Sequence, residues 1–244
     1  GVKVMAFPEL CLTAYTCSDL FLQESLLREA KKELKRILQA SKSKDMILFV
    51  GMPWMHKGKL YNVAAVLNRG RILGIVPKKH LPNYSEFYEL RHFNPGMEKV
   101  EMTDWEGVQV PMGMNLLFAC RTMPELVLAA ELCEDVWVPC PPSISHALAG
   151  ATVIANCSAS DETTGKDQYR YNLICGQSAR LVCGYIYANA GEGESTQDLV
   201  FGGQNLIAEN GTMLAEAKRF QNTVIYGEID VQRLADERRR LSTY

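Results

Sequence analysis

Short apolar runs recur along the chain and alternate with longer stretches in which apolar residues keep helical spacing. Apolar runs of this length, bounded by turn residues, are typical of buried strands. Two pairs of runs join around Asn68-Arg69-Gly70 and Glu209-Asn210-Gly211, which predicts two hairpins. The other predicted strands cover residues 2–7, 46–52, 115–118, 126–132, 151–155, 183–190 and 223–229.

Helical spacing is clearest between Leu20 and Ala40, where Leu27, Ala30, Leu34 and Leu38 fall on one stripe. We expect an amphipathic surface helix there, capped by Ser18-Asp19. Further helices are predicted over residues 168–181 and from Val231 onward. Residues 77–96 are rich in Pro, Asn, Tyr and Glu without periodicity, which predicts a long functional loop or lid.

Strands and helices that alternate, with hairpins among them, favour an α/β fold in which helices cover a mixed sheet. The chain has 244 residues and shows no linker or repeat, so we expect residues 1–244 to form one domain. Polar residues gather where predicted strands end, which is where open α/β sheets place their sites.

Composition excludes several classes of function. Hydrophobic residues make up 47% and charged residues 22%, as in ordinary globular proteins. The net charge of -2 is spread along the chain, so we expect no nucleic-acid partner. No apolar run approaches the ~20 residues of a membrane span, so we expect no membrane partner. The eight cysteines form no C-x-x-C pair, which argues against a metal site, and without a secretory leader we expect a cytoplasmic protein.

Cys133 is the first candidate for chemistry because it follows an apolar strand and is flanked by Glu131, Glu134 and Asp135. Acidic neighbours raise the pKa of a thiol, so a reactive cysteine here would need a cation or a base. An inert core cysteine beside solvated acids explains the same pattern.

Glu9 and Lys78 also follow predicted strands, and each taken alone is explained by a structural role. Glu9 lies between apolar segments, and poor hydration makes a carboxylate a stronger base. Together with Cys133 these residues supply a nucleophile, a base and an ammonium for an oxyanion. A Cys-His arrangement has less support, since none of the four histidines adjoins a second candidate thiol.

Three motifs carry a family resemblance: Phe7-Pro-Glu9-Leu, Pro77-Lys78-Lys-His-Leu-Pro82 and Glu131-Leu-Cys133-Glu-Asp135. Their order and spacing resemble the catalytic motifs of the nitrilase superfamily. Three further segments resemble the glutaminase domain of glutamine-dependent NAD synthetases; they are Leu12 to Phe21, Leu81 to Glu89 and Gly191 to Asp198.

The resemblance implies an α-β-β-α sandwich with mixed sheets and a glutaminase that releases ammonia for NAD synthesis from deamido-NAD. Glu9 would be the general base, Lys78 would stabilise the oxyanion and Cys133 would form a γ-glutamyl thioester. Tyr84, Glu134, Ser160 and Lys166 would bind the amino-acid head of L-glutamine. Lys166 stands where relatives carry Arg. Lys would bind the substrate's carboxylate through a point contact, where Arg would make a forked contact.

The resemblance also sets expectations about partners and cofactors. The first strand and helix of the nitrilase fold would precede Val2, and a C-terminal synthetase domain would be absent from this chain. Glutamine hydrolysis would need no cofactor, while ATP and Mg would belong to that synthetase domain. We expect the synthetase domain of the same full-length protein as a partner, and a homo-oligomer.

Two other functions remain open at this point. The same trio could hydrolyse a different small amide, as an ω-amidase or a carbamoyl-hydrolysing nitrilase does. The chain could instead be a catalytically silent structural module, although such a module has no chemical need for all three residues.

Overall fold

The computed structural model describes residues 1–244 and contains two mixed six-stranded sheets. In the first sheet the strand order is β1-β2-β3-β4-β6-β5, and in the second it is β12-β11-β10-β9-β8-β7. The strands of the first sheet are β1 Val4–Ala6, β2 Ile47–His56, β3 Lys59–Asn68, β4 Arg71–Pro77, β5 Glu101–Trp105 and β6 Val108–Met112. Those of the second are β7 Phe118–Ala119, β8 Val127–Leu132, β9 Val153–Ser158, β10 Gly184–Asn189, β11 Leu206–Glu209 and β12 Thr212–Glu216.

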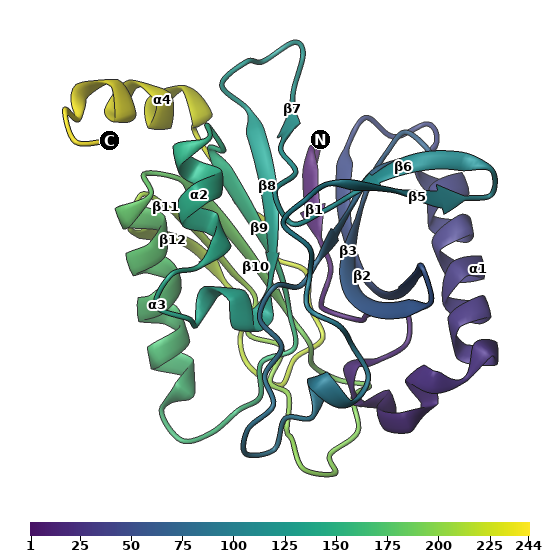
Figure 1. Ribbon diagram of the computed structural model, residues 1–244. Coiled ribbons are helices and arrows are strands. Elements are labelled where there is room, and N and C mark those ends of the chain that lie inside the picture. The colour runs from purple at the N-terminus through teal and green to yellow at the C-terminus, as the bar shows by residue number, and fades with distance from the viewer.

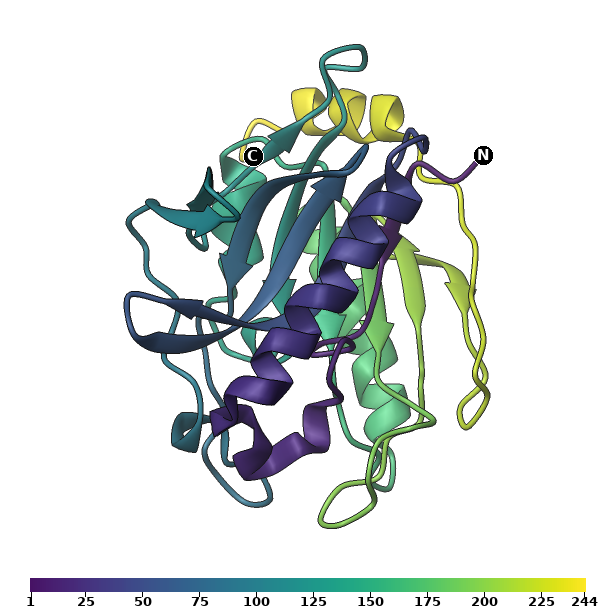
Figure 2. The ribbon, with the colours of Figure 1, turned by 90° about the vertical axis from the view of Figure 1, so that its right-hand side faces the viewer.

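Helices lie on the outer sides of the two sheets (Figure 1). Helix α1 (Glu24–Ser41) covers the first sheet, whereas α2 (Pro142–Leu148) and α3 (Lys166–Arg180) cover the second. Figure 2, turned by 90°, shows α1 running across its sheet. Helix α4 is Val231–Arg240, and three short 3-10 helices are η1 Tyr15–Leu22, η2 Glu89–Arg91 and η3 Cys133–Val136.

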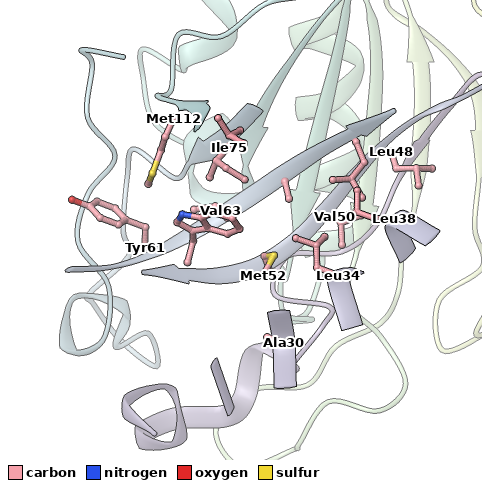
Figure 3. Packing of buried hydrophobic residues seen from close by; sticks show 14 residues of the cluster. Ala30, Leu34, Leu38, Leu48, Val50, Met52, Tyr61, Val63, Ile75 and Met112 are labelled. Atoms are coloured by element: carbon pink, nitrogen blue, oxygen red, sulfur yellow. The ribbon is translucent and has the colours of Figure 1, made fainter. Parts of the chain in front are cut away.

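The outer core of the first sheet forms because α1 and β2 each present one apolar face. Ala30, Leu34 and Leu38 of α1 pack against Val50 and Met52 of β2, as Figure 3 shows. The three α1 residues recur at helical spacing and the two β2 residues at strand spacing, so each set falls on one face. Burial of these two faces fixes the helix on the sheet.

A second apolar core lies between the two sheets. Phe49, Val66 and Val76 of the first sheet meet Leu132 and Ala155 of the second within one buried cluster. A third cluster joins the second sheet to α2 and α3. The layers are therefore helix, sheet, sheet and helix, and this packing brings the ends of β1, β4 and β8 close together.

Most elements match the sequence predictions. Both hairpins form, and α1, α3 and α4 occupy the expected segments. The hairpin of β5 and β6, the helix α2 and the short helices have no counterpart among the predictions. Strand β2 continues past the predicted end at residue 52 through Pro53. Proline is tolerated there because β1 pairs with β2 only up to Phe49, which leaves that side of Pro53 without a ladder partner.

Three predictions are wrong. Of the strand expected over residues 115–118 only Phe118 lies in a strand, because Leu116 and Leu117 pack against the apolar clusters without joining a ladder. Residues 223–229 form no strand: they are mostly exposed and pair with no neighbouring strand, so their apolar run has no ladder to join. Ser18-Asp19 does not cap α1, because η1 intervenes and Gln23 is the N-cap residue, without a side-chain capping bond. Asp19 instead binds Arg91 and His92. No helix combines the length and the apolar character that crossing a membrane requires.

Candidate active site

Three strand ends deliver Glu9, Lys78 and Cys133. Glu9 follows β1, Lys78 directly follows β4, and Cys133 directly follows β8. All three are buried, with Glu9 and Lys78 fully shielded and Cys133 6% exposed. The backbone N–H of Glu9 donates to the carbonyl of Ser158 at 3.2 Å, which ties the first sheet to the end of β9 in the second.

The turn that carries Glu9 rests directly on β2 at Gly51. A Cβ at Gly51 would lie 2.5 Å from the backbone nitrogen of Leu10 and would collide with the backbone of Pro8. Leu10 itself adopts a positive φ of 51°, a left-handed conformation that costs a non-glycine residue energy. The absence of a side chain at Gly51 therefore lets the turn approach closely enough to place Glu9.

Lys78 lies between two buried carboxylates. Its Nζ donates to Glu9 Oε1 at 2.7 Å and to Glu89 Oε1 at 2.6 Å. Glu9 also accepts from Asn62 Nδ2 at 2.6 Å, and its other oxygen accepts from the backbone N–H of Ala159 at 3.0 Å. An ammonium has three N–H donors, so one remains to bind a further oxygen.

The charges of this cluster act on the Cys133 thiol. Burial raises the pKa of Cys133 well above its usual value; Glu9 adds to this rise, and Lys78 opposes it. Burial alone would lower the pKa of Lys78, but the carboxylates of Glu89 and Glu9 outweigh it and raise that pKa. At neutral pH Cys133 is therefore a thiol, and it would need a base to remove its proton before it could act as a nucleophile.

Glu89 is an ionisable group of the site that the sequence analysis did not single out. It is 4% exposed, and its Oε1 also accepts from Tyr15 Oη at 2.8 Å. Burial raises the pKa of Glu89, Lys78 counteracts the rise, and Glu9 adds to it. Its one sequence signal was its place in the Leu81 to Glu89 segment within the long loop.

Cys133 begins η3 with a positive φ of 39°, so the chain turns sharply where the strand ends. Two side chains hold this turn. The Asp135 carboxylate accepts from the backbone N–H groups of Leu132 and His80 at 3.0 and 2.8 Å. The side-chain amide oxygen of Asn156 accepts from the N–H of Cys133 at 3.0 Å.

Of the predicted head-binding residues, Tyr84 and Glu134 are in direct contact. The hydroxyl of Tyr84 donates to Glu134 at 3.0 Å, and burial raises the pKa of Glu134. The Tyr84 ring packs edge-on against Phe87 at 5.7 Å between ring centroids. Tyr84 is 55% exposed, so this part of the site reaches the surface.

The other two predicted residues, Ser160 and Lys166, belong to a neighbouring charged cluster. Lys166 pairs with Asp161, and its Nζ lies 5.9 Å from the Phe87 ring centroid. Ser160 Oγ accepts from the buried Arg170 at 3.2 Å. Arg170 lies one helical turn after Lys166 and was not among the predicted residues; its sequence signal was that i, i+4 spacing.

A cavity of about 90 Å³ adjoins the lysine cluster on the side of Glu89. Its lining includes Tyr15, Phe87 and Glu89. No group of three or more His, Cys, Asp or Glu side chains is arranged to hold a metal ion.

Comparisons with known proteins identify relatives of this chain. A glutamine-dependent NAD(+) synthetase of Mycobacterium tuberculosis is 44% identical over 246 residues, covering 100% of this chain and 36% of that relative. One from Aquifex aeolicus is 33% identical over 247 residues, covering 99% of this chain and 40% of the relative. This chain thus spans well under half the length of these relatives.

Solved structures extend the comparison to the fold. The crystal structure of a glutamine-dependent NAD(+) synthetase from Cytophaga hutchinsonii matches with a TM-score of 0.79 and 29% identity, over 89% of this chain and 35% of that one. A carbon-nitrogen hydrolase from Helicobacter pylori, 21% identical, matches with a TM-score of 0.72 over 98% of this chain and 80% of its own, which supports the nitrilase-like fold. The carbon-nitrogen hydrolase family itself matches residues 1–239, so the chain belongs to that family.

Proposed function

We propose that this chain hydrolyses the side-chain amide of L-glutamine to glutamate and ammonia, with Cys133 as the nucleophile. The observation that carries the proposal is the buried Glu9–Lys78–Glu89 cluster, whose charges act on the Cys133 thiol. A buried ammonium shared by two carboxylates, beside a thiol, supplies the base, the oxyanion donor and the nucleophile for acyl transfer.

Glu9 takes the thiol proton as Cys133 Sγ attacks the amide carbon. The carbonyl oxygen becomes an oxyanion, and the free N–H of Lys78 stabilises it. Glu9 then gives the proton to the amide nitrogen, the C–N bond breaks, and ammonia leaves a γ-glutamyl thioester on Cys133. A water molecule next gives a proton to Glu9 and attacks the thioester. The C–S bond breaks, glutamate leaves, and the thiol regains its proton from Glu9.

The choice of glutamine rests on the charges near the thiol. The Glu134 carboxylate is suited to the α-ammonium of an amino acid, and Tyr84 fixes its orientation. Lys166 and the hydroxyl of Ser160 are suited to the α-carboxylate, since each retains donor hydrogens beyond its present contacts. An amino-acid head bound there would present its side-chain amide to Cys133.

The relatives named above suggest how the ammonia is used. They are called glutamine-dependent NAD(+) synthetases, so we propose that this chain is the glutaminase part of such an enzyme and supplies ammonia for NAD formation from deamido-NAD. ATP and Mg would then be required by the synthetase part, in a separate reaction from glutamine hydrolysis.

The proposal is tested by measuring ammonia release from glutamine, asparagine, succinamate and N-carbamoyl amino acids, together with glutamate release from glutamine. We expect kcat/KM to be highest for glutamine and Cys133→Ala to be inactive. A diazo-ketone analogue of glutamine should add covalently to Cys133 of the wild type, as mass spectrometry would show. A higher kcat/KM for another amide would mean that this amide, and not glutamine, is the substrate. If the folded wild type does not react at all, the chain is a catalytically silent module.

A further inference from the structure

A chain of buried hydrogen bonds runs from the backbone of Cys133 into the second sheet. Asn156 of β9 accepts from the Cys133 N–H at 3.0 Å and from Ser158 Oγ at 2.8 Å. Its Nδ2 donates to Tyr185 Oη of β10 at 3.0 Å, and Tyr185 in turn donates to Glu131 Oε1 of β8. The members of this relay have no more than 6% of their surface exposed.

The far end of the relay is fixed as firmly as the near end. Glu131 Oε2 accepts from the backbone N–H of Ser143, in the first turn of α2, at 2.8 Å. Ser143 Oγ accepts from Gln177 Nε2 of α3 at 3.0 Å. The relay therefore connects the nucleophile's backbone to three adjacent strands and to both helices that cover them.

The orientation of the Asn156 amide follows from its partners. A backbone N–H can only donate, so the atom that faces Cys133 must be the amide oxygen. The amide nitrogen then faces Tyr185, whose hydroxyl accepts from it while donating to Glu131. A flip of the amide would place Nδ2 against the Cys133 N–H, donor against donor, so the bond to Cys133 fixes the orientation.

Cys133 needs such support because its backbone is strained. With a φ of 39°, it occupies a left-handed conformation that a residue with a Cβ adopts only when the surroundings hold it. Its N–H also lies at the start of η3, where backbone donors lack helical partners. Asp135 binds the N–H of Leu132, the residue before Cys133, whereas Asn156 binds the N–H of Cys133 itself.

We infer that Asn156 is a positioning residue that holds Cys133 in the strained turn from which its sulfur reaches the substrate carbon, with the Tyr185–Glu131 pair fixing the Asn156 amide. The inference deepens the proposed function and rests on Cys133 as the nucleophile. Asn156 fixes the position of the Cys133 sulfur and does not contact the head-binding residues. Its loss should therefore lower kcat and the reactivity of the thiol more than it changes KM.

The central test replaces Asn156 by leucine in the full chain, because leucine has nearly the same shape and lacks both polar atoms. We expect Asn156→Leu to lower kcat for glutamine about 100-fold, since small displacements of a reacting group have effects of this order, while KM changes less than about threefold. Alkylation of Cys133 by iodoacetamide, followed by mass spectrometry, should slow about tenfold or more.

Three variants separate positioning from general damage. Asn156→Asp keeps an oxygen for the Cys133 N–H, so it should recover kcat to within about tenfold of the wild type. Tyr185→Phe keeps the ring but frees the Asn156 amide, so it should fall between wild type and Asn156→Leu. Asn68→Leu is the matched control. Asn68 ends β3 and donates to the carbonyl of Met46 at 2.9 Å, six residues along β3 from Asn62, which binds Glu9. Its kcat should equal that of the wild type.

The outcomes discriminate clearly. The inference would be overturned if Asn156→Leu kept the wild-type kcat and the wild-type rate of Cys133 alkylation, or if its only change were a higher KM. An equal loss of kcat in Asn68→Leu would also overturn it. Failure of Asn156→Asp to restore activity although the variant is folded would overturn it as well. If the wild type hydrolyses no glutamine but alkylation of Cys133 still slows in Asn156→Leu, the positioning role stands and the proposed substrate fails.

Discussion

At the scale of single residues, the site depends on one buried cation. Lys78 is the ammonium that neutralises Glu9 and Glu89, and all three side chains are shielded from solvent. Removing one partner of a buried ion pair leaves an uncompensated charge, which typically destabilises a protein by about 3–5 kcal/mol. The cluster is thus a structural unit as well as a candidate catalytic one.

Lys78→Met should therefore reduce both activity and stability. Without the ammonium, the pKa of Glu89 rises further above its unfolded value, so the stability contribution of Glu89 falls as pH increases through the range between the two pKa values. We expect the loss in melting temperature relative to wild type to be larger at pH 8 than at pH 5. Thermal unfolding at the two pH values measures it, and an equal loss at both would contradict the reasoning.

Glu134 should act on binding more than on chemistry. Glu134→Gln keeps the shape but removes the charge proposed for the α-ammonium, so KM for glutamine should rise about tenfold or more, with kcat less affected. Glutaramate, which lacks the ammonium, should lose its disadvantage against glutamine in this variant. The exposed Glu98→Gln serves as the control and should retain wild-type kinetics. Unchanged discrimination between the two amides would remove Glu134 from the head site.

At the scale of elements, strand ends and the turns that follow them decide where functional groups lie. The close contact between Gly51 of β2 and the turn of Glu9 is the tightest of these. Sequence patterns revealed the strands but not this contact, because it joins segments that are about forty residues apart. The same applies to Asn62 and Glu89, whose partners come from other elements.

Gly51→Ala should displace the Glu9 turn. The added Cβ would meet backbone atoms, which cannot rotate away, so we expect kcat to fall about 100-fold and stability to drop by about 1–3 kcal/mol. Gly176→Ala is a matched control, because a Cβ on this α3 glycine meets no atom within 4 Å. Alanine favours helix by about 1 kcal/mol there, so that variant should be active and no less stable. Denaturant unfolding and kinetics on both variants provide the comparison.

At the scale of the whole molecule, buried carboxyl groups couple stability to pH. Burial raises the pKa of Glu131 from its usual 4.5 to about 7 and that of Asp135 to about 6. Each folded pKa lies above the unfolded one, so the unfolded state loses its proton first as pH rises. The stability contributed by Glu131 therefore declines between about pH 4.5 and pH 7, that contributed by Asp135 declines between about pH 3.8 and pH 6, and both are constant above those ranges.

Glu131→Gln removes one of these titrations. From pH 5 to pH 8 the free energy of unfolding should fall further in the wild type than in the variant. The raised pKa of Glu131 makes this extra loss on the order of 3 kcal/mol. Glu24→Gln, at an exposed position, should keep the wild-type slope. Urea unfolding at intervals of pH measures the slopes, and identical slopes for wild type and Glu131→Gln would contradict the prediction.

If the chain belongs to a longer synthetase, the division of labour can be tested there. Cys133→Ala in the full-length protein should abolish NAD formation with glutamine as nitrogen source, while formation with free ammonia survives. Assays with the two nitrogen sources, run on the same preparation, separate the steps. Equal loss with both sources would mean that Cys133 serves the synthetase reaction or the fold instead.

The local pattern of apolar and polar residues determined the elements whose two faces differ. The hairpins, α1 and α3 follow from periodicity, and the ordered motifs around Glu9, Lys78 and Cys133 marked the candidate trio. The pattern failed where the surroundings decide. Residues 223–229 carry the apolar run of a strand but pair with no neighbouring strand, and Pro53 is accepted because β1 pairs with β2 only as far as Phe49.

Only the tertiary structure decided which side chains form hydrogen bonds and ion pairs with one another. Asn156 carries no local mark of its role, and the sequence signals of Glu89 and Arg170 do not name their partners, because hydrogen bonds and ion pairs depend on distance in space and not on separation along the chain. The sequence by itself supplied the candidate nucleophile, the candidate base and the cation at strand ends. Packing of two sheets brought those ends together, excluded water, and thereby set the pKa values on which the proposed chemistry depends.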